Sequence, residues 1–150
     1  MITIRRILVP TDLSPAATPA VRYGAELAEK FGAELILLTI VHDLALVIPD
    51  AVMPTPVATP DLDELMASTR MGLTRVVEEL NLGRFHPQLE VRIGSPATEI
   101  VATATELKAD LICLGTHGRG ALAHLLLGSV AEQVVRHAPC PVLTVRSPRT

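Results

Sequence analysis

Aromatic residues are scarce in this 150-residue chain, which has two Phe, one Tyr and no Trp. A planar ligand could therefore not be held between aromatic rings. Cysteine is equally scarce. Cys113 and Cys140 each lie in an apolar segment, so we expect two buried, reduced thiols rather than a disulfide framework. No apolar run reaches about 18 residues, so the sequence predicts no membrane span.

Basic residues are not in excess, because 13 Lys and Arg stand against 16 Asp and Glu and the net charge is −3. This balance argues against a general nucleic-acid binder, which would usually be basic. The opening segment MITIRRILVP has no apolar region after its arginines, so we expect no signal peptide and a cytoplasmic protein. The length and the 49% hydrophobic content predict one ordered domain over residues 1–150.

Apolar runs alternate along the chain with segments of helical period. Strands are expected at 3–10, 33–42, 88–94, 109–115 and 140–146, with helices between them. The second of these runs is apolar at consecutive positions, which indicates burial on both faces. We therefore predict a single-domain α/β fold of the Rossmann-like or flavodoxin-like kind. Its five-stranded parallel sheet would have the order 3-2-1-4-5 and helices on both faces.

The helix boundaries are less sharply marked. Ser14-Pro15 and Thr18-Pro19 are both suitable N-cap and N1 pairs, and the sequence leaves open which one starts the first helix. Gly32 is its expected C-terminal stop. The later helices are expected to start at Thr59-Pro60, to run from Ser95-Pro96 to about Leu107, and to run from Ser129 to His137. Residues 44–60 hold four prolines and show no period, which predicts a long loop that acts as a lid.

The predicted strand order places a topological switch between the first and fourth strands, where ligands bind outside the carboxyl ends. The first strand ends in VPTDLS and the fourth in LGTHGRG. We expect Gly115 and Gly118 to build a turn whose N–H groups bind an anion. Gly128-Ser129 would then return the chain to a helix N-terminus, which favours phosphate.

Two residues of this predicted site, Ser129 and Asp12, also have an ordinary structural interpretation. Residues 129–132, SVAE, match a capping box, which explains Ser129 but not the glycines at the switch point. Asp12 stands in a D-x-S-P segment just before a helix, a pattern that often serves turn and cap chemistry.

Several other kinds of site are not supported by the sequence. Ala121 follows Gly120 where a P-loop requires Lys, and G-x-G-x-x-G is absent. The pair His42-Asp43 lacks the further ligands of a metal-dependent hydrolase, and His117 and His124 are a weak metal pair. Ser14, Ser95 and Ser129 are interpreted as caps rather than as members of a Ser-His-Asp set. We therefore predict no catalytic residue and no metal ligand from the protein itself.

The spacing G-x2-G-x9-G-[ST], formed by Gly115, Gly118, Gly128 and Ser129, resembles that of the ATP-binding branch of the universal stress protein family. The segments VPTDLS and GSPATEI match as well, and the resemblance covers essentially the whole chain. It implies a regulatory protein of the stress response that acts through nucleotide-dependent conformation and dimerisation. It also implies ATP as the ligand, with Mg²⁺ or Mn²⁺ held by the phosphates.

The family's contacts, carried over to this sequence, imply a set of nucleotide-binding residues. Asp12 would bond near the ribose, and the backbone of Ile40 would read the adenine edge. The remaining implied contacts are Pro10 and Thr11 lining the pocket, Leu114, Gly115, His117 and Gly118 flanking ribose and phosphates, and Gly128, Ser129 and Val130 on the phosphate tail. Some relatives have a hydroxyl residue where this chain has Ala131, and Arg119 is either a compensating phosphate partner or a solvated loop residue.

Three functions compete: an ATP-binding regulator, a slow ATPase, and a dimerisation module with an empty site. The glycine motif disfavours the third, and the missing P-loop lysine disfavours the second. The last strand, 140–146, should lie at an edge of the sheet, where an uncovered apolar strand is an aggregation hazard. We therefore expect a homodimer in which two copies of this strand pair antiparallel about a two-fold axis.

Overall fold

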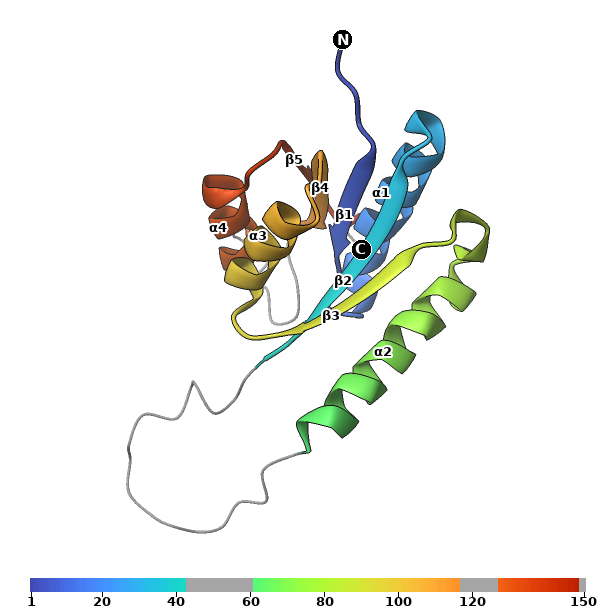
Figure 1. Cartoon of the computed structure of the whole chain (residues 1–150), viewed down its shortest axis with the longest axis vertical. Coiled ribbons are helices and arrows are strands. Elements are labelled where there is room, and N and C mark those ends of the chain that lie inside the picture. The colour runs from blue at the N-terminus through green and yellow to red at the C-terminus, as the bar shows by residue number, and fades with distance from the viewer. Residues whose placement is uncertain (43–60, 117–126, 149–150) are drawn as a thin grey trace.

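Five parallel strands form the centre of the computed structural model, which describes residues 1–42, 61–116 and 127–148 (Figure 1). The strands are β1 (Arg6–Pro10), β2 (Glu34–Val41), β3 (Gln88–Ile93), β4 (Leu111–Gly115) and β5 (Val142–Val145). Their order is β3-β2-β1-β4-β5, and every pair is parallel. The predicted sheet order is confirmed, and β1 and β4 are neighbours at the switch point.

Helices cover both faces of the sheet, as the sequence predicts (Figure 1). They are α1 (Thr18–Phe31), α2 (Leu62–Glu79), α3 (Pro96–Glu106) and α4 (Ser129–His137), with short 3-10 turns at η1 (Pro15–Ala17) and η3 (Gly83–Phe85). The helices α1 and α2 lie on one face, and α3 and α4 lie on the other. No helix in the described ranges is long and apolar enough to cross a bilayer.

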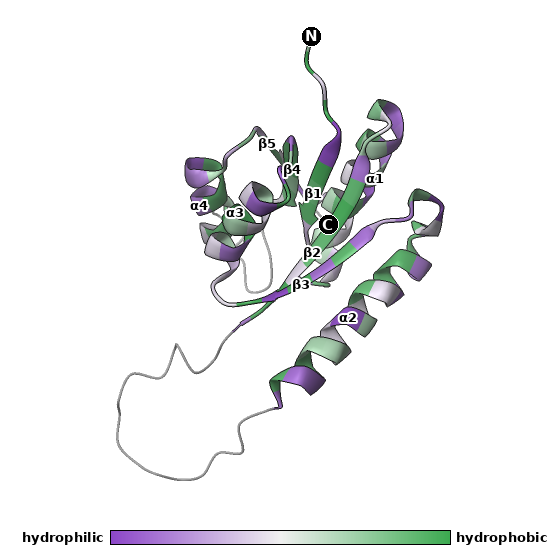
Figure 2. Ribbon diagram, viewed as in Figure 1, coloured by the Kyte–Doolittle hydropathy of each residue, from purple (hydrophilic) through white to green (hydrophobic). Residues whose placement is uncertain are grey.

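The alternation of side chains along the strands divides the core into two clusters. Ile7, Val9, Leu35, Leu37 and Cys113 pack toward α1 and α2. Leu8, Ile36, Leu38, Ile112 and Leu114 pack toward α3 and α4. Each aliphatic side chain buried in this way contributes about 1.5–3 kcal/mol. In Figure 2 the central strands are mainly apolar beyond their first residues, Arg6 of β1 and Glu34 of β2.

The start of the first helix uses both proline pairs. Pro15 begins the 3-10 turn η1, and Pro19 lies in the first turn of α1. The C-terminal stop at Gly32 is confirmed, since this residue adopts φ 62° and donates its N–H to the last turn. The expected start of α2 at Thr59-Pro60 falls on residues outside the described ranges. The helix begins at Leu62, because the carboxylate of Asp61 accepts the N–H of Asp63 at 3.0 Å and caps it.

Both cysteines are thiols, but their surroundings differ. Cys113 in β4 is fully buried, and burial raises its pKa to about 12. Cys140, before β5, is only half-buried, and desolvation raises its pKa as well. A thiol with a raised pKa is a poor nucleophile at neutral pH, so Cys113 acts as a small core residue.

Candidate functional site

The carboxyl ends of β1 and β4 lie next to each other because the two strands pair, Ile7 with Leu111 and Leu8 with Ile112. Pro10 ends β1 and is buried, and Leu114 near the end of β4 is buried as well. Ile40, toward the end of β2, is half-buried against the cluster under α3 and α4. These three side chains give the edge an aliphatic wall.

The segment after β1, residues 11–14, forms a turn that is held by hydrogen bonds to its own side chains. The hydroxyl oxygen of Thr11 accepts the N–H of Leu13 at 3.1 Å. The Oδ1 atom of Asp12 accepts the N–H of Ser14 at 2.9 Å and also its hydroxyl. The turn chemistry suggested by D-x-S-P is therefore present, and it fixes the orientation of the Asp12 carboxylate at the sheet edge.

Leu13 attaches this segment to α2. It adopts φ 65°, a left-handed conformation that is uncommon for a residue with a branched side chain. Its side chain lies against Gly72 of α2, where an added Cβ would fall within 3.0 Å of Leu13. The loop that carries Asp12 is thus held by β1 from one side and by α2 from the other.

A hydrogen bond attaches the N-terminus of α4 to the end of β4. Gly128 donates its N–H to the carbonyl of Thr116 at 2.6 Å, and Thr116 donates its own N–H to Val145 at 3.0 Å. Gly115 is the last residue of β4, in register with Val145, as the strand predicted at 109–115 requires. The turn expected at Gly115 is wrong, because this residue does not have a positive φ.

The cap of α4 is one residue earlier than a capping box requires. Gly128 occupies the N-cap position with φ −67° and ψ 158°, and Ser129 is already the first helical residue. The carboxylate of Glu132 pairs with Arg136 at 2.9 Å. The capping-box interpretation of Ser129 is therefore wrong. The first turn of α4 is exposed at Ser129 and Val130. The backbone N–H groups of this turn have no acceptor within the helix.

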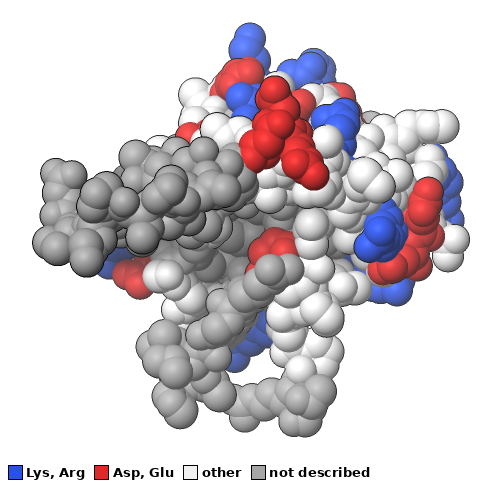
Figure 3. All heavy atoms as spheres, turned by 90° about the horizontal axis from the view of Figure 1, so that it is seen from below, with Lys and Arg blue, Asp and Glu red and all other residues white. Residues whose placement is uncertain are grey.

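Every implied contact residue except His117 and Gly118 lies in the described ranges. His117, Gly118, Arg119 and His124 fall outside them, as does the whole of the expected lid, 44–60. The ends of β1, β2 and β4 and the start of α4 gather the others at one side of the sheet. Figure 3 views this side, and the described Lys, Arg, Asp and Glu residues there are intermixed rather than sorted by sign.

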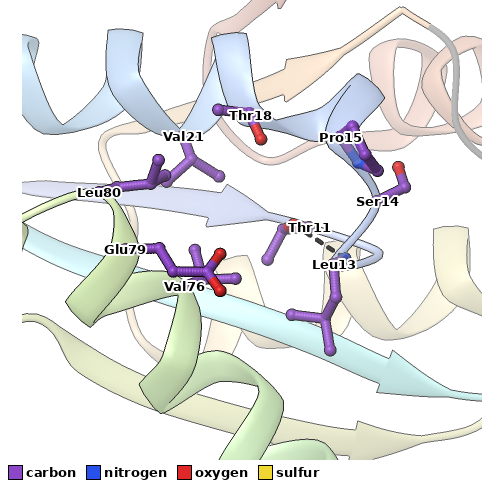
Figure 4. Close-up of a pocket in the computed structure, with 9 residues that line it drawn as sticks. All are labelled: Thr11, Leu13, Ser14, Pro15, Thr18, Val21, Val76, Glu79 and Leu80. Atoms are coloured by element: carbon purple, nitrogen blue, oxygen red, sulfur yellow. Dashed lines mark hydrogen bonds between the residues drawn. The ribbon is translucent and has the colours of Figure 1, made fainter.

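A cavity of about 280 Å³ lies on the α1 and α2 side of the sheet (Figure 4). It is lined by Thr11, Leu13, Ser14, Pro15, Thr18, Val21, Val76, Glu79 and Leu80. Of the predicted contacts only Thr11 reaches it, and its hydroxyl is engaged with Leu13. The cavity is therefore not the crevice between β1 and β4, and the Thr11 side chain faces away from the wall formed by Ile40 and Leu114.

One buried residue at the edge was not predicted from the sequence. Thr39 in β2 is 4% exposed, and its hydroxyl donates to the carbonyl of Thr11 at 3.0 Å. The available signal was a hydroxyl residue interrupting the apolar run 33–42. Such a residue, once buried, must find an acceptor.

The comparisons with known proteins agree with this architecture. The model of the universal stress protein family matches residues 3–146. A universal stress protein of Methanocaldococcus jannaschii is 34% identical over 146 residues, which cover 97% of this chain and 84% of that protein. The solved universal stress protein UspA from Lactobacillus plantarum is 29% identical, with a TM-score of 0.76 over 96% of this chain and 99% of its own.

A further solved universal stress protein, in complex with cAMP, is 24% identical with a TM-score of 0.60, over 97% of this chain and 99% of its own. At that identity the likeness shows the fold alone. The family model, in contrast, matches nearly the full length, and the M. jannaschii relative matches at higher identity over the same span. The chain belongs to the universal stress protein family.

Proposed function

We propose that this chain is a regulatory protein that binds ATP at the side of the sheet where β1 and β4 end. The observation that carries the proposal is the attachment of the α4 N-terminus to β4 through Gly128 and Thr116. A helix N-terminus held at a topological switch point offers N–H donors and a positive dipole end to phosphate. The glycine at position 128 supports the same conclusion. Its φ of −67° is open to any residue, so its backbone conformation does not require glycine, whereas close approach by a ligand does.

The rest of the edge suits the other parts of an adenine nucleotide. The Asp12 carboxylate, oriented by Ser14, would accept a hydrogen bond from a ribose hydroxyl. The apolar wall of Pro10, Ile40 and Leu114 would take the flat base without aromatic stacking. The solved neighbour with cAMP bound is a protein of the same fold, and for this chain the proposal rests on its own residues.

We propose that a divalent ion, Mg²⁺ or Mn²⁺, accompanies the phosphates rather than occupying a protein site. Among residues 1–42, 61–116 and 127–148, no group of three or more His, Cys, Asp or Glu side chains is placed to hold a metal. Mg²⁺ usually keeps several waters and binds through substrate phosphates with only one or two carboxylates, so it needs no cage of protein ligands. Because the sequence has no P-loop lysine, we propose binding rather than rapid hydrolysis.

We also propose that two copies associate through β5. The two edges of the sheet differ in chemistry. At the β3 edge Arg92 forms ion pairs with Glu90 and Glu106 at 3.3 and 3.0 Å, and charged edge residues discourage pairing with another strand. The β5 residues VLTV are half-buried and carry no charge. The β5 edge is therefore the one suited to a two-fold strand pairing.

Native mass spectrometry tests the ligand directly. The purified protein is incubated with Mg²⁺ and an equimolar mixture of ATP and GTP, and the bound mass is read. We expect an adduct of ATP on each chain and little GTP. A spectrum with no nucleotide adduct, or with equal amounts of both, would count against an adenine-specific site.

A further inference from the structure

Thr39 is the one hydroxyl residue in the apolar part of β2. It lies on the α1 and α2 side of the sheet, like Leu35 and Leu37. Because it is 4% exposed, its hydroxyl needs a protein partner, since an unpaired buried hydroxyl is destabilising. The partner is the carbonyl oxygen of Thr11, 3.0 Å away and 28 residues earlier in the chain.

The Thr11 carbonyl is where the ladder between β1 and β2 would otherwise continue. Alternate residues of β2 form backbone hydrogen bonds with the chain of β1 and its flanking residues. Glu34 donates its N–H to the carbonyl oxygen of Arg5, and the Leu38 carbonyl accepts the N–H of Thr11, both at 2.8 Å. In a regular parallel ladder the next bond would run from the N–H of Ile40 to the carbonyl of Thr11.

That next bond is not formed. Among the backbone hydrogen bonds of residues 1–42, none joins Ile40 to Thr11. The register of β1 with β2 ends at Pro10 and Leu38, and the Thr11 carbonyl takes the hydroxyl of Thr39 instead. Ile40 therefore keeps a backbone N–H that points toward the β1 side at the sheet edge.

We propose that Thr39 is a positioning residue for nucleotide recognition. Its hydroxyl takes the place of Ile40 at the Thr11 carbonyl, which leaves the Ile40 N–H available to an acceptor atom on the adenine edge. This inference rests on the proposed ATP site. In this proposal the buried Thr39 side chain ends the hydrogen-bond ladder between β1 and β2 just before Ile40. The Ile40 amide that is left unpaired at the sheet edge is then a ready hydrogen-bond donor for the base.

Two variants separate this role from simple packing. Thr39→Val keeps the branched shape and removes the hydroxyl, so the Thr11 carbonyl becomes free to accept from Ile40 and the ladder extends. Thr39→Ser keeps the hydroxyl. The first readout is amide hydrogen exchange at Ile40 without nucleotide, measured by ¹⁵N-resolved NMR. We expect at least about tenfold slower exchange in Thr39→Val than in the parent, and parent-like exchange in Thr39→Ser. Slow exchange already in the parent, or no change in Thr39→Val, would overturn the inference whether or not the protein binds ATP.

The second readout is ligand affinity with Mg²⁺ present, for ATP and for inorganic tripolyphosphate, which has no base. Thr39→Val should lose about tenfold in affinity for ATP, equivalent to about 1.4 kcal/mol, and should bind tripolyphosphate like the parent. Thr39→Ser should bind both like the parent. Equal losses for the two ligands would mean that Thr39 only supports the fold, and unchanged ATP affinity would remove its role. A parent that binds neither ligand would contradict the proposed function itself, and the exchange measurement would still test Thr39.

Discussion

Gly128 donates its backbone N–H to the carbonyl oxygen of Thr116 across 2.6 Å, which fixes the first turn of α4 beside the end of β4. Thr116 is 3% exposed and donates in turn to Val145 of β5. The position of the helix N-terminus is therefore set by the sheet itself. The phosphate site that we propose at this turn would be preorganised, so that binding there would not require the helix to move.

The first prediction concerns the glycine at this junction. Gly128→Val should abolish ATP binding, because a branched side chain at the N-cap blocks approach to the backbone of α4. The fold should stay close to that of the parent, since φ −67° and ψ 158° suit a β-branched residue. Calorimetry and thermal melting measure the two effects. Gly83→Val, at a site where an added Cβ meets nothing within 4 Å, is the matched control. A Gly128→Val protein that binds like the parent would place the site elsewhere.

The second prediction concerns the carboxylate after β1. Asp12→Ala should weaken adenosine and ATP alike, by about tenfold or more, because a hydrogen bond to a charged group contributes about 1.5–3 kcal/mol. Ser14→Ala is the control, since it removes one bond to Asp12 Oδ1 and keeps the carboxylate and the 2.9 Å bond from the Ser14 N–H. It should lose much less affinity. If Ser14→Ala weakens binding as much as Asp12→Ala does, the carboxylate serves the turn and not the ribose.

The third prediction concerns the β5 edge. In light scattering the parent should have about twice the mass of one 16.0 kDa chain. Leu143→Lys, which puts a charge on this strand, should shift the mass toward one chain. Gln88→Lys, on the opposite edge strand β3, should leave the mass unchanged. A parent of one chain at micromolar concentration, or a dimer that Leu143→Lys leaves intact, would defeat the pairing through β5.

The fourth prediction concerns the pH dependence of stability. Burial raises the pKa of Cys113 from its ordinary value of 9.0 to about 12. Between these values the unfolded chain releases the proton and the folded chain keeps it. The free energy of unfolding therefore falls as pH rises through this window, by up to about 1.4 kcal/mol per pH unit from this group.

Cys113→Ala isolates this effect. The variant should be less stable than the parent near neutral pH, because it leaves a cavity in the core. The gap should narrow as the pH rises above about 9. Urea unfolding under reducing conditions at several pH values measures it, and Cys140→Ala, at a half-buried position, is the comparison. Parallel pH curves for the parent and Cys113→Ala would contradict a buried, neutral thiol.

The sheet could be predicted from the sequence because its signals are local and repeated. Consecutive apolar residues in β2 and the alternation of strands and helices both indicate a parallel sheet, and Gly32 marks the end of the helix between the first two strands. The switch point between β1 and β4 follows from that order alone. For this reason the side of the sheet that carries Asp12 and Gly128 could be predicted from the sequence.

The details of that edge depend on contacts between distant residues, and there the sequence was a poorer guide. Ser129 fits a capping box, yet Gly128 takes the cap position while its N–H is held by Thr116. Gly115 was expected both to end the strand 109–115 and to open a turn, and its pairing with Val145 leaves only the first of these expectations standing. The role of Thr39 depends on a bond to Thr11 that no local pattern encodes.

The most direct test of the account is titration calorimetry of the purified protein with ATP and Mg²⁺. The account predicts saturable binding with roughly one site per chain, and its loss in Gly128→Val while Gly83→Val binds normally. An absence of binding heat at millimolar ATP, together with no adenine nucleotide retained by the purified protein, would contradict the central claim.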